Sequence, residues 1–201
     1  KDNFKGGSRP SSNGAWLIAN SYGTKYNDGG YFWLSYEEPS ISDIYTMAVE
    51  TTANYENIYQ YDGNGWSDAV SIPGNDFTGA NVFTSSSSFE ETLNAVSFYT
   101  ISDNQKYTIK IYKNLTGTTP DTGTLASACT ISGTADYSGY HTIKLPTSCT
   151  LSPGSKFAVA ITYKYDASTK NQAYIPIEGR SELNSGVLYS YASEPGQSYL
   201  Y

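Results

Sequence analysis

Apolar and polar residues alternate with a period of two along much of the chain, and this pattern predicts β-strands rather than helices. The alternation is clearest in the runs 107–113 and 157–163, where aromatic and β-branched residues occupy every second position. Side chains two positions apart lie on one face of a strand, so each run should bury that face against an opposing sheet. The expected strands are residues 15–19, 31–36, 44–50, 56–61, 93–101, 107–113, 125–131, 140–145, 157–163, 173–178 and 186–191.

Short turn-forming segments separate the expected strands. Residues 102–104, 119–121 and 152–154 combine Ser, Asp, Asn, Thr, Pro and Gly, which favour tight turns. No strong helical period occurs anywhere in the sequence. The pattern therefore predicts an all-β chain folded as an antiparallel β-sandwich, with an N-terminal β-hairpin of different character before it.

Composition and charge narrow the classes of molecule that this chain is expected to bind. Among the 201 residues are 20 Tyr, 7 Phe and 18 Gly. Tyr combines an apolar ring with a polar tip, which suits half-buried sheet faces and wet binding surfaces. The net charge is −7 and no basic cluster is present to neutralise phosphates, so nucleic acid and anionic membranes are not expected as partners. The sequence has no run of about 18 apolar residues, so we expect no membrane insertion.

The two cysteines are Cys129 and Cys149. A single Met, few Lys and abundant Tyr, Ser, Thr and Gly favour an extracellular setting, in which the pair would form a disulfide. Such a bridge would add about 3 kcal/mol of stability by the chain-entropy model. The alternative is two small buried thiols. The lone histidine, His141, and these cysteines fit no zinc spacing, so neither a metal nor a cofactor is expected.

The stretch GAWLIANSYGTKYNDGGYFWLSY at residues 14–36 carries a more specific signal. It resembles the end of a papain-like cysteine peptidase domain, with Tyr22 at a position where that family has Trp. The resemblance implies that Asn20 is the asparagine that orients the catalytic histidine and that Tyr22 shields this hydrogen bond. The positions that match the family pattern are Trp16, Asn20, Gly23, Gly30 and Tyr31.

The chemistry of such a site explains these residue types. A thiolate nucleophile needs an imidazolium partner whose ring is held in one orientation. The side-chain carbonyl of Asn20 can accept the ring N–H without adding a negative charge, and Tyr22 would be a smaller shield than Trp. The alternative is a turn that only closes a hairpin, as Asn and Gly often do.

The other members of that site are missing from the sequence. No histidine precedes Asn20, and neither cysteine stands in the nucleophile setting of the family. His141 is in phase with Ile143 and Leu145 on an expected strand, which indicates a histidine on a sheet face rather than a catalytic one. We therefore expect the catalytic Cys and His to come from polypeptide upstream of Lys1, and this chain alone to be inactive.

The rest of the chain resembles the lectin-like domain that directly follows a papain-like peptidase in bacterial secreted proteins. This resemblance implies a jelly-roll-like sandwich and contact with a glycan or protein surface, but no fixed sugar-binding residues. The expected organisation is residues 1–50 as peptidase segment, 51–80 as connecting strands and 81–201 as lectin-like sandwich. The segments that carry the resemblance are residues 55–63, 95–100, 107–114, 139–145 and 153–161.

Trp66 is the candidate for stacking on a sugar, with packing at the domain junction as the alternative. The preferred hypothesis is the C-terminal portion of an exported bacterial cysteine peptidase, located outside the cell or on its surface. The alternative is a stand-alone carbohydrate- or surface-binding module without catalysis.

Overall fold

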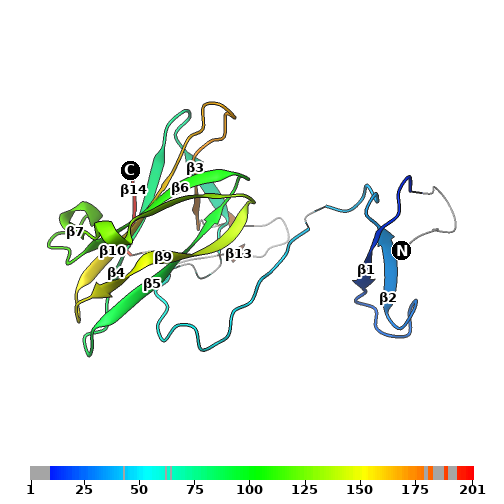
Figure 1. The fold of residues 1–201 in the computed structure, drawn as a ribbon, viewed down its shortest axis with the longest axis horizontal. Coiled ribbons are helices and arrows are strands. Elements are labelled where there is room, and N and C mark those ends of the chain that lie inside the picture. The colour runs from blue at the N-terminus through cyan, green and yellow to red at the C-terminus, as the bar shows by residue number, and fades with distance from the viewer. Residues whose placement is uncertain are drawn as a thin grey trace. The chain divides into compact units, whose positions relative to one another are not determined.

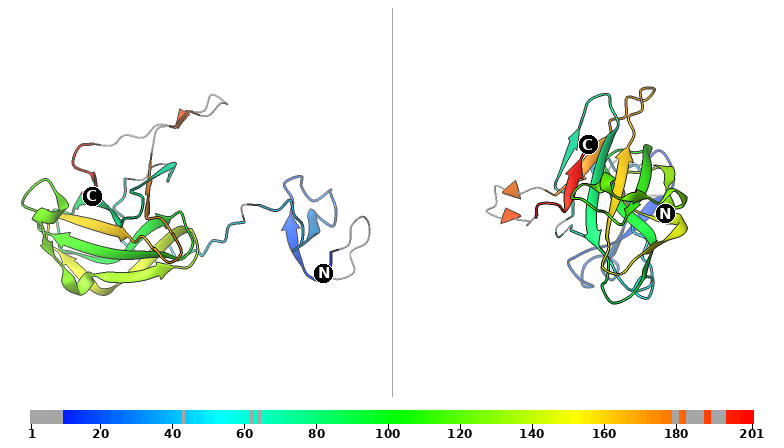
Figure 2. Two further views of the ribbon diagram at one scale, coloured as in Figure 1. Left: turned by 90° about the horizontal axis from the view of Figure 1, so that it is seen from above. Right: turned by 90° about the vertical axis from the view of Figure 1, so that its left-hand side faces the viewer.

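The computed structural model describes residues 10–42, 44–61, 63, 65–178 and 194–201, together with the backbone of 181–182 and 188–189. The chain divides into two compact units, Lys1–Glu56 and Asn57–Tyr201. The first unit contains a single β-hairpin, and the second contains the remaining strands (Figures 1 and 2). In the part of the chain that the structure describes, no helix has the length and apolar character needed to cross a membrane.

The first unit is built on strands β1 (Ala15–Ala19) and β2 (Tyr31–Ser35), which pair antiparallel with Ala15 opposite Ser35. This confirms the hairpin expected from the sequence. Gly14, just before β1, has a φ of +122°, and a Cβ at this position would lie 2.7 Å from the Tyr36 ring. Only glycine therefore allows the Tyr36 ring to lie this close to the start of β1.

Glu37, just after β2, ties the incoming chain to the hairpin. Its carboxylate accepts the backbone N–H of Ser11 at 2.6 Å, the backbone N–H of Ser12 at 2.7 Å, and both serine hydroxyls. The hydrogen bond from the Ser12 hydroxyl, followed by that from the Ser11 N–H, lowers the pKa of Glu37 from 4.5 to about 2. The carboxylate thus stays ionised, and able to hold residues 11–12, except in strong acid.

The second unit contains a six-stranded antiparallel sheet in the order β14-β4-β10-β6-β7, with β8 also pairing with β6. Strand β10 lies between β4 and β6 and contains the run 157–163, in which the sequence has a large apolar residue at every second position. The strands are β4 (Phe77–Thr84), β6 (Gln105–Lys113), β7 (Thr124–Leu125), β8 (Ile131–Ala135), β10 (Lys156–Tyr163) and β14 (Ser198–Leu200).

The opposing layer consists of two antiparallel pairs, β5 with β9 and β3 with β11. Strands β5 (Glu91–Thr100) and β9 (Gly139–Leu151) lie side by side (Figure 1), and their register shifts at an irregularity between Leu93 and Ala95. Strands β12 and β13 form a further short pair. The remaining elements are β3 (Asp68–Ser71), β11 (Tyr174–Ile177), β12 (Ser181–Glu182), β13 (Leu188–Tyr189) and the 3-10 turns η1 (Pro120–Thr122) and η2 (Ser127–Cys129).

The main core lies between these two layers, because each contributes alternate side chains to one cluster. Ile109 and Ile111 of β6 are fully buried and belong to the same cluster as Val96 and Phe98 of the opposing β5. The structure is therefore all-β with two packed antiparallel layers, as the alternation predicted. The other buried members of the cluster are Phe77, Tyr107, Cys129, Ala135, Leu145, Cys149, Tyr163, Ala173 and Ile175.

A smaller core is covered by the segment Asn57–Tyr61, which we call the strap. Phe83, Leu151 and the fully buried Phe157 form this core, and Tyr59 and Tyr61 pack against it. The Tyr61 ring stacks on Phe83 with centroids 4.8 Å apart, and its hydroxyl donates to the Val82 carbonyl at 2.6 Å.

The structure corrects three strand predictions. Residues 44–50 and 56–61 contain no strand, and residues 125–131 are interrupted by η2. Ile44, Tyr45, Met47 and Val49 are 61–90% exposed, because this alternating run has no partner strand among the described residues. Strands β3 and β4 were not predicted individually, and the expected strand at 186–191 falls partly outside the described residues.

Candidate functional site

Asn20 lies at the first position after β1, in the turn of the hairpin. Its backbone N–H donates to the Gly30 carbonyl at 2.9 Å, which extends the ladder by one residue beyond the strand. Its side-chain Oδ1 accepts the backbone N–H of Tyr22 at 2.8 Å, which closes an Asx turn. Gly30 has a φ of +94°, and a Cβ there would lie 3.2 Å from the Gly23 carbonyl oxygen, so both motif glycines belong to this turn.

The Asn20 amide keeps hydrogen-bonding capacity after the turn is made. A carbonyl oxygen has two lone pairs, and Oδ1 uses one of them for Tyr22. The Nδ2 group is buried and has no partner among the described residues. Because the Tyr22 N–H can only donate, the amide oxygen must face the turn. The remaining lone pair of Oδ1 can accept one further N–H, as a histidine ring would require.

The aromatic residues around Asn20 are largely open to solvent. The Tyr22 side chain is 77% exposed and lies edge-on to Tyr26, with ring centroids 5.8 Å apart. Trp16 is 46% exposed and lies edge-on to Tyr36, with ring centroids 4.8 Å apart. A ring this exposed cannot by itself keep water away from a hydrogen bond at Asn20. The shielding role of Tyr22 therefore stays a prediction, and it requires another protein surface packed against the ring.

The two cysteines are buried free thiols, so the expected disulfide is not formed. Cys129 ends η2 and Cys149 lies on β9, and both belong to the main core. Burial, with a further contribution from the neighbouring Cys129, raises the pKa of the Cys149 thiol from 9.0 to about 12. Composition indicated a compartment in which disulfides persist, but a bridge needs specific geometry between two Cβ atoms, and these residues instead pack as small apolar groups.

His141 and Trp66 lie in the second unit. The His141 Nε2 is 3.0 Å from the Thr100 Oγ1, and its ring packs against Phe98 with centroids 5.9 Å apart. This is the sheet-face environment that its phase indicated. Trp66 is 47% exposed, in the loop before β3. Among the described residues, no group of three or more His, Cys, Asp or Glu is placed to hold a metal ion.

Sequence reasoning missed two features that depend on pairing between distant segments. One is the carboxylate of Glu91, which accepts hydrogen bonds from the Tyr59 hydroxyl, the Asn57 amide and, at 2.7 Å, the Ser86 N–H. It thereby anchors the strap. The other is a pair of aromatic rings, Tyr99 and Tyr140, which lie opposite each other on β5 and β9. Alternation alone could have placed each tyrosine on the outward-facing side of its own strand. It could not have shown that the two rings lie opposite each other.

Solved structures of known proteins match nearly the whole chain. Two similar solved structures are both of Cwp84, named in one as a surface layer associated protein of Clostridium difficile. One is a cysteine-to-alanine variant of this clostridial cysteine protease after propeptide cleavage, 29% identical with a TM-score of 0.73, covering 95% of this chain and 46% of that one. The other contains the cysteine protease and lectin-like domains, 28% identical with a TM-score of 0.69, covering 96% of this chain and 41% of that one.

The chain thus spans less than half the length of either Cwp84 chain. No curated protein matches its sequence. The family model described as "Lectin like domain" matches residues 58–201, which is most of the chain and nearly all of the second unit. The similarity to both Cwp84 structures over nearly the whole chain is consistent with a lectin-like domain of such peptidases. This chain therefore belongs to the lectin-like domain family.

Proposed function

We propose that the chain is the C-terminal portion of an exported bacterial papain-like cysteine peptidase. In this proposal it supplies the last hairpin of the catalytic domain and a lectin-like accessory domain. The observation that carries the proposal is the Asn20 amide, which retains a carbonyl lone pair at the end of β1. Its context supports this reading, because Cwp84, a cysteine protease, is similar to the chain over the hairpin as well as the sandwich.

The chemistry would be acyl transfer through a thioester. A thiolate from the upstream segment attacks the peptide carbonyl, the upstream histidine protonates the leaving amine, and water then hydrolyses the thioester. The role of Asn20 is to accept the histidine ring N–H and hold the ring toward the sulfur. Tyr22 would cover this hydrogen bond once the rest of the catalytic domain packs against the hairpin. Neither Cys129 nor Cys149 takes part, because both thiols are buried in the sandwich.

The test is the Asn20→Ala substitution in the full-length parent protein. Loss of a group that orients a general acid–base should lower kcat for a fluorogenic peptide by roughly 10²-fold. It should also shift the pH profile that reports the thiolate–imidazolium pair, whereas a purely structural residue would change the folded fraction only. Asn13→Ala, at an exposed residue just before the hairpin, is the matched control. Unchanged kcat and pH profile in a folded Asn20→Ala protein would refute the assignment.

The partner of the first unit in this proposal is the upstream peptidase segment, and the location is the cell surface or its exterior. The sandwich would hold the enzyme on a wall or glycoprotein surface, or brace the catalytic domain. The second candidate is a binding module without catalysis, which is favoured by the fact that residues 57–201 enclose their own cores. A coding sequence upstream of Lys1 that contains a Cys and a His in papain-like settings separates the two.

A further inference from the structure

The exposed face of the β5–β9 pair carries two tyrosines at one end. Tyr99 lies opposite Tyr140, with ring centroids 4.7 Å apart and ring planes inclined by 55°. The alternate residues Phe98 and His141 pack together on the inner side, so the two tyrosines face outward. Tyr140 is 57% exposed, and neither phenol oxygen has a hydrogen-bond partner in the described part of the chain.

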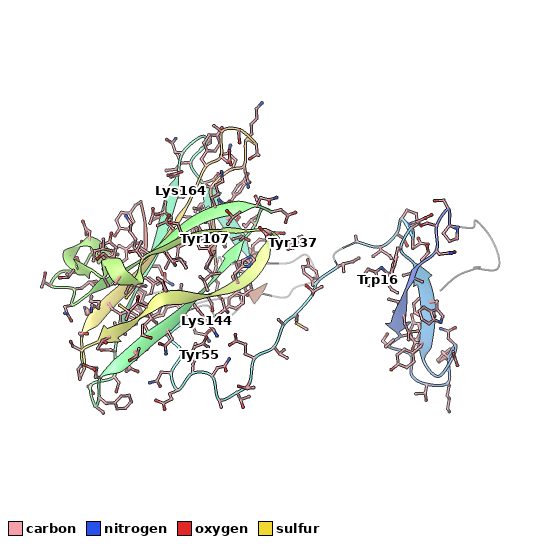
Figure 3. All side chains as sticks on the ribbon, in the orientation of Figure 1. Trp16, Tyr55, Tyr107, Tyr137, Lys144 and Lys164 are labelled. Atoms are coloured by element: carbon pink, nitrogen blue, oxygen red, sulfur yellow. The ribbon has the colours of Figure 1, made fainter. Side chains whose placement is uncertain are left out.

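Hydroxyl and ammonium groups continue this face along the strands. Next to the tyrosines, the hydroxyls of Ser97 and Thr142 are 2.9 Å apart, and Lys144 follows two positions further along β9. Lys144 takes part in neither of the salt bridges found among the described residues. Figure 3 shows Lys144 along the β5–β9 pair and Tyr137 at the end where β9 begins.

Charge on this face differs from that of the chain as a whole. The chain contains 19 Asp and Glu and has a net charge of −7. Nevertheless, neither residues 92–100 of β5 nor residues 139–151 of β9 include a single acidic residue. An anionic ligand would therefore meet a cation and hydroxyl donors here without a carboxylate in these parts of the two strands.

The loop before β3 adds a third aromatic residue near the tyrosine end. A Cβ on Gly65 would lie 3.4 Å from the Tyr99 hydroxyl, so the loop backbone passes next to this ring. Trp66 is the following residue and is half exposed. The sequence singled out Trp66 alone, and the structure places its loop beside Tyr99.

We propose that the exposed face of β5 and β9, from Tyr99 and Tyr140 to Lys144, binds an extended glycan strand that carries acidic groups. The aromatic rings would stack on the apolar faces of sugar rings, the Ser97 and Thr142 hydroxyls would bond sugar hydroxyls, and Lys144 would pair with a carboxylate. Ala95 lies opposite Lys144 and so marks the other end of the face. At about 3.4 Å per residue, the span from Tyr99 to Ala95 is about 14 Å, which suits a short oligosaccharide rather than one sugar.

This inference rests on the proposed role of the sandwich in surface attachment and is independent of catalysis. An acidic glycan fits the face better than an apolar partner, because hydroxyls and an ammonium group follow the aromatic end. It also fits better than an added peptide strand, which would pair with backbone at a sheet edge rather than lie across the side chains.

The test is a glycan array probed with residues 1–201, bearing cello-oligosaccharides, chito-oligosaccharides, oligogalacturonates and the methyl esters of the oligogalacturonates. We expect binding to oligogalacturonates that exceeds binding to their methyl esters and weakens with salt. Tyr140→Ala should weaken binding to oligogalacturonate about 5- to 10-fold, whereas Tyr140→Phe, which keeps the ring, should change it little. Lys144→Gln should remove the preference for the carboxylate over the ester.

Two controls decide whether this face is responsible. Tyr45→Ala in the exposed linker and Lys156→Gln at the start of β10 should leave binding unchanged. Silence across the array overturns the glycan proposal, as does binding that survives both Tyr140→Ala and Lys144→Gln. Neither result affects the peptidase proposal, which is tested separately by kcat of Asn20→Ala in the parent.

Discussion

Replacing Glu91 with Ala should detach the strap from the sandwich and lower the stability of the second unit. The Glu91 carboxylate accepts hydrogen bonds from Asn57, Tyr59 and Ser86, and the substitution removes this acceptor from all three. The Ser86 N–H keeps a second acceptor, the Tyr59 hydroxyl at 3.2 Å. The Asn57 side chain is exposed, so water can replace its partner at little cost. The Tyr59 hydroxyl and the Ser86 N–H are partly buried, and together they should lose about 1–2 kcal/mol.

The expected loss is therefore about 1–2 kcal/mol, or about 2–8 °C in Tm for a unit of this size. Urea unfolding followed by near-ultraviolet circular dichroism measures this free energy through the midpoint and slope. Glu91→Gln keeps an acceptor without the charge and should lose about half as much. Glu90→Ala, at the exposed neighbouring residue, is the control and should stay within about 0.5 kcal/mol of the parent.

The contribution of Glu91 to the free energy of unfolding should also depend on pH, and the direction of this dependence follows from its pKa. Burial alone would raise the pKa of Glu91, but the hydrogen bonds from Tyr59, Ser86 and Asn57 outweigh it and lower the pKa below 4.5. A carboxyl whose folded pKa is depressed stabilises the fold above its unfolded pKa and loses that contribution as pH falls through the folded value. The difference between parent and Glu91→Ala should be full at pH 7 and narrow below about pH 4. A difference that is absent at pH 7, or that grows in acid, would refute the reasoning.

The other predictions concern the two cores. Both thiols are buried, and the pKa of Cys149 is about 12. A maleimide at pH 7 should therefore label neither cysteine in the native chain, but both cysteines in denaturant. A thiol count of zero in denaturant would indicate a disulfide instead. Phe157→Ala should cost about 3–5 kcal/mol in urea unfolding, because this fully buried ring contacts Tyr59 and Phe83, whereas Phe157→Leu should cost clearly less. Equal costs for both substitutions would mean that the site collapses around the smaller side chain.

The sequence predicted strands well where burial alternates strictly and poorly where packing replaces alternation. Strand β6 alternates between buried and more exposed residues along most of its length, and its predicted range of 107–113 lies within two residues of the observed bounds. Strand β4 was missed because Gly79 interrupts its apolar pattern. A Cβ on Gly79 would lie 3.1 Å from an Ile175 side-chain carbon, so this glycine makes room for β11, which is more than 90 residues away in the sequence. Conversely, residues 44–50 alternate well but lack a partner strand among the described residues.

The candidate sites also differ in how far the sequence alone could predict them. The hairpin turn at Asn20 could be predicted because the residues that define it are close in sequence, and the hairpin register follows from them. The disulfide was inferred from composition, which reports the environment of a protein and not the geometry between two side chains. Glu91 gave no local signal, since its partners Asn57 and Tyr59 come from a segment more than 30 residues earlier.

The outer face of β5 and β9 shows what could and could not be predicted about binding. Once Val96 and Phe98 are known to be buried, Ser97 and Tyr99 must face outward, because successive side chains alternate. The same step places Tyr140, Thr142 and Lys144 outward on β9. Whether these two sets form one continuous row depends on the register of the two strands. The register pairs residues 41 to 49 positions apart in this row, and it shifts between Leu93 and Ala95. A one-residue slip would move one tyrosine to the inner face and separate the aromatic pair. The proposed glycan site is therefore a property of strand pairing, because the whole row from Tyr99 to Ala95 lies in unbroken register on one side of the irregularity at Leu93/Ala95.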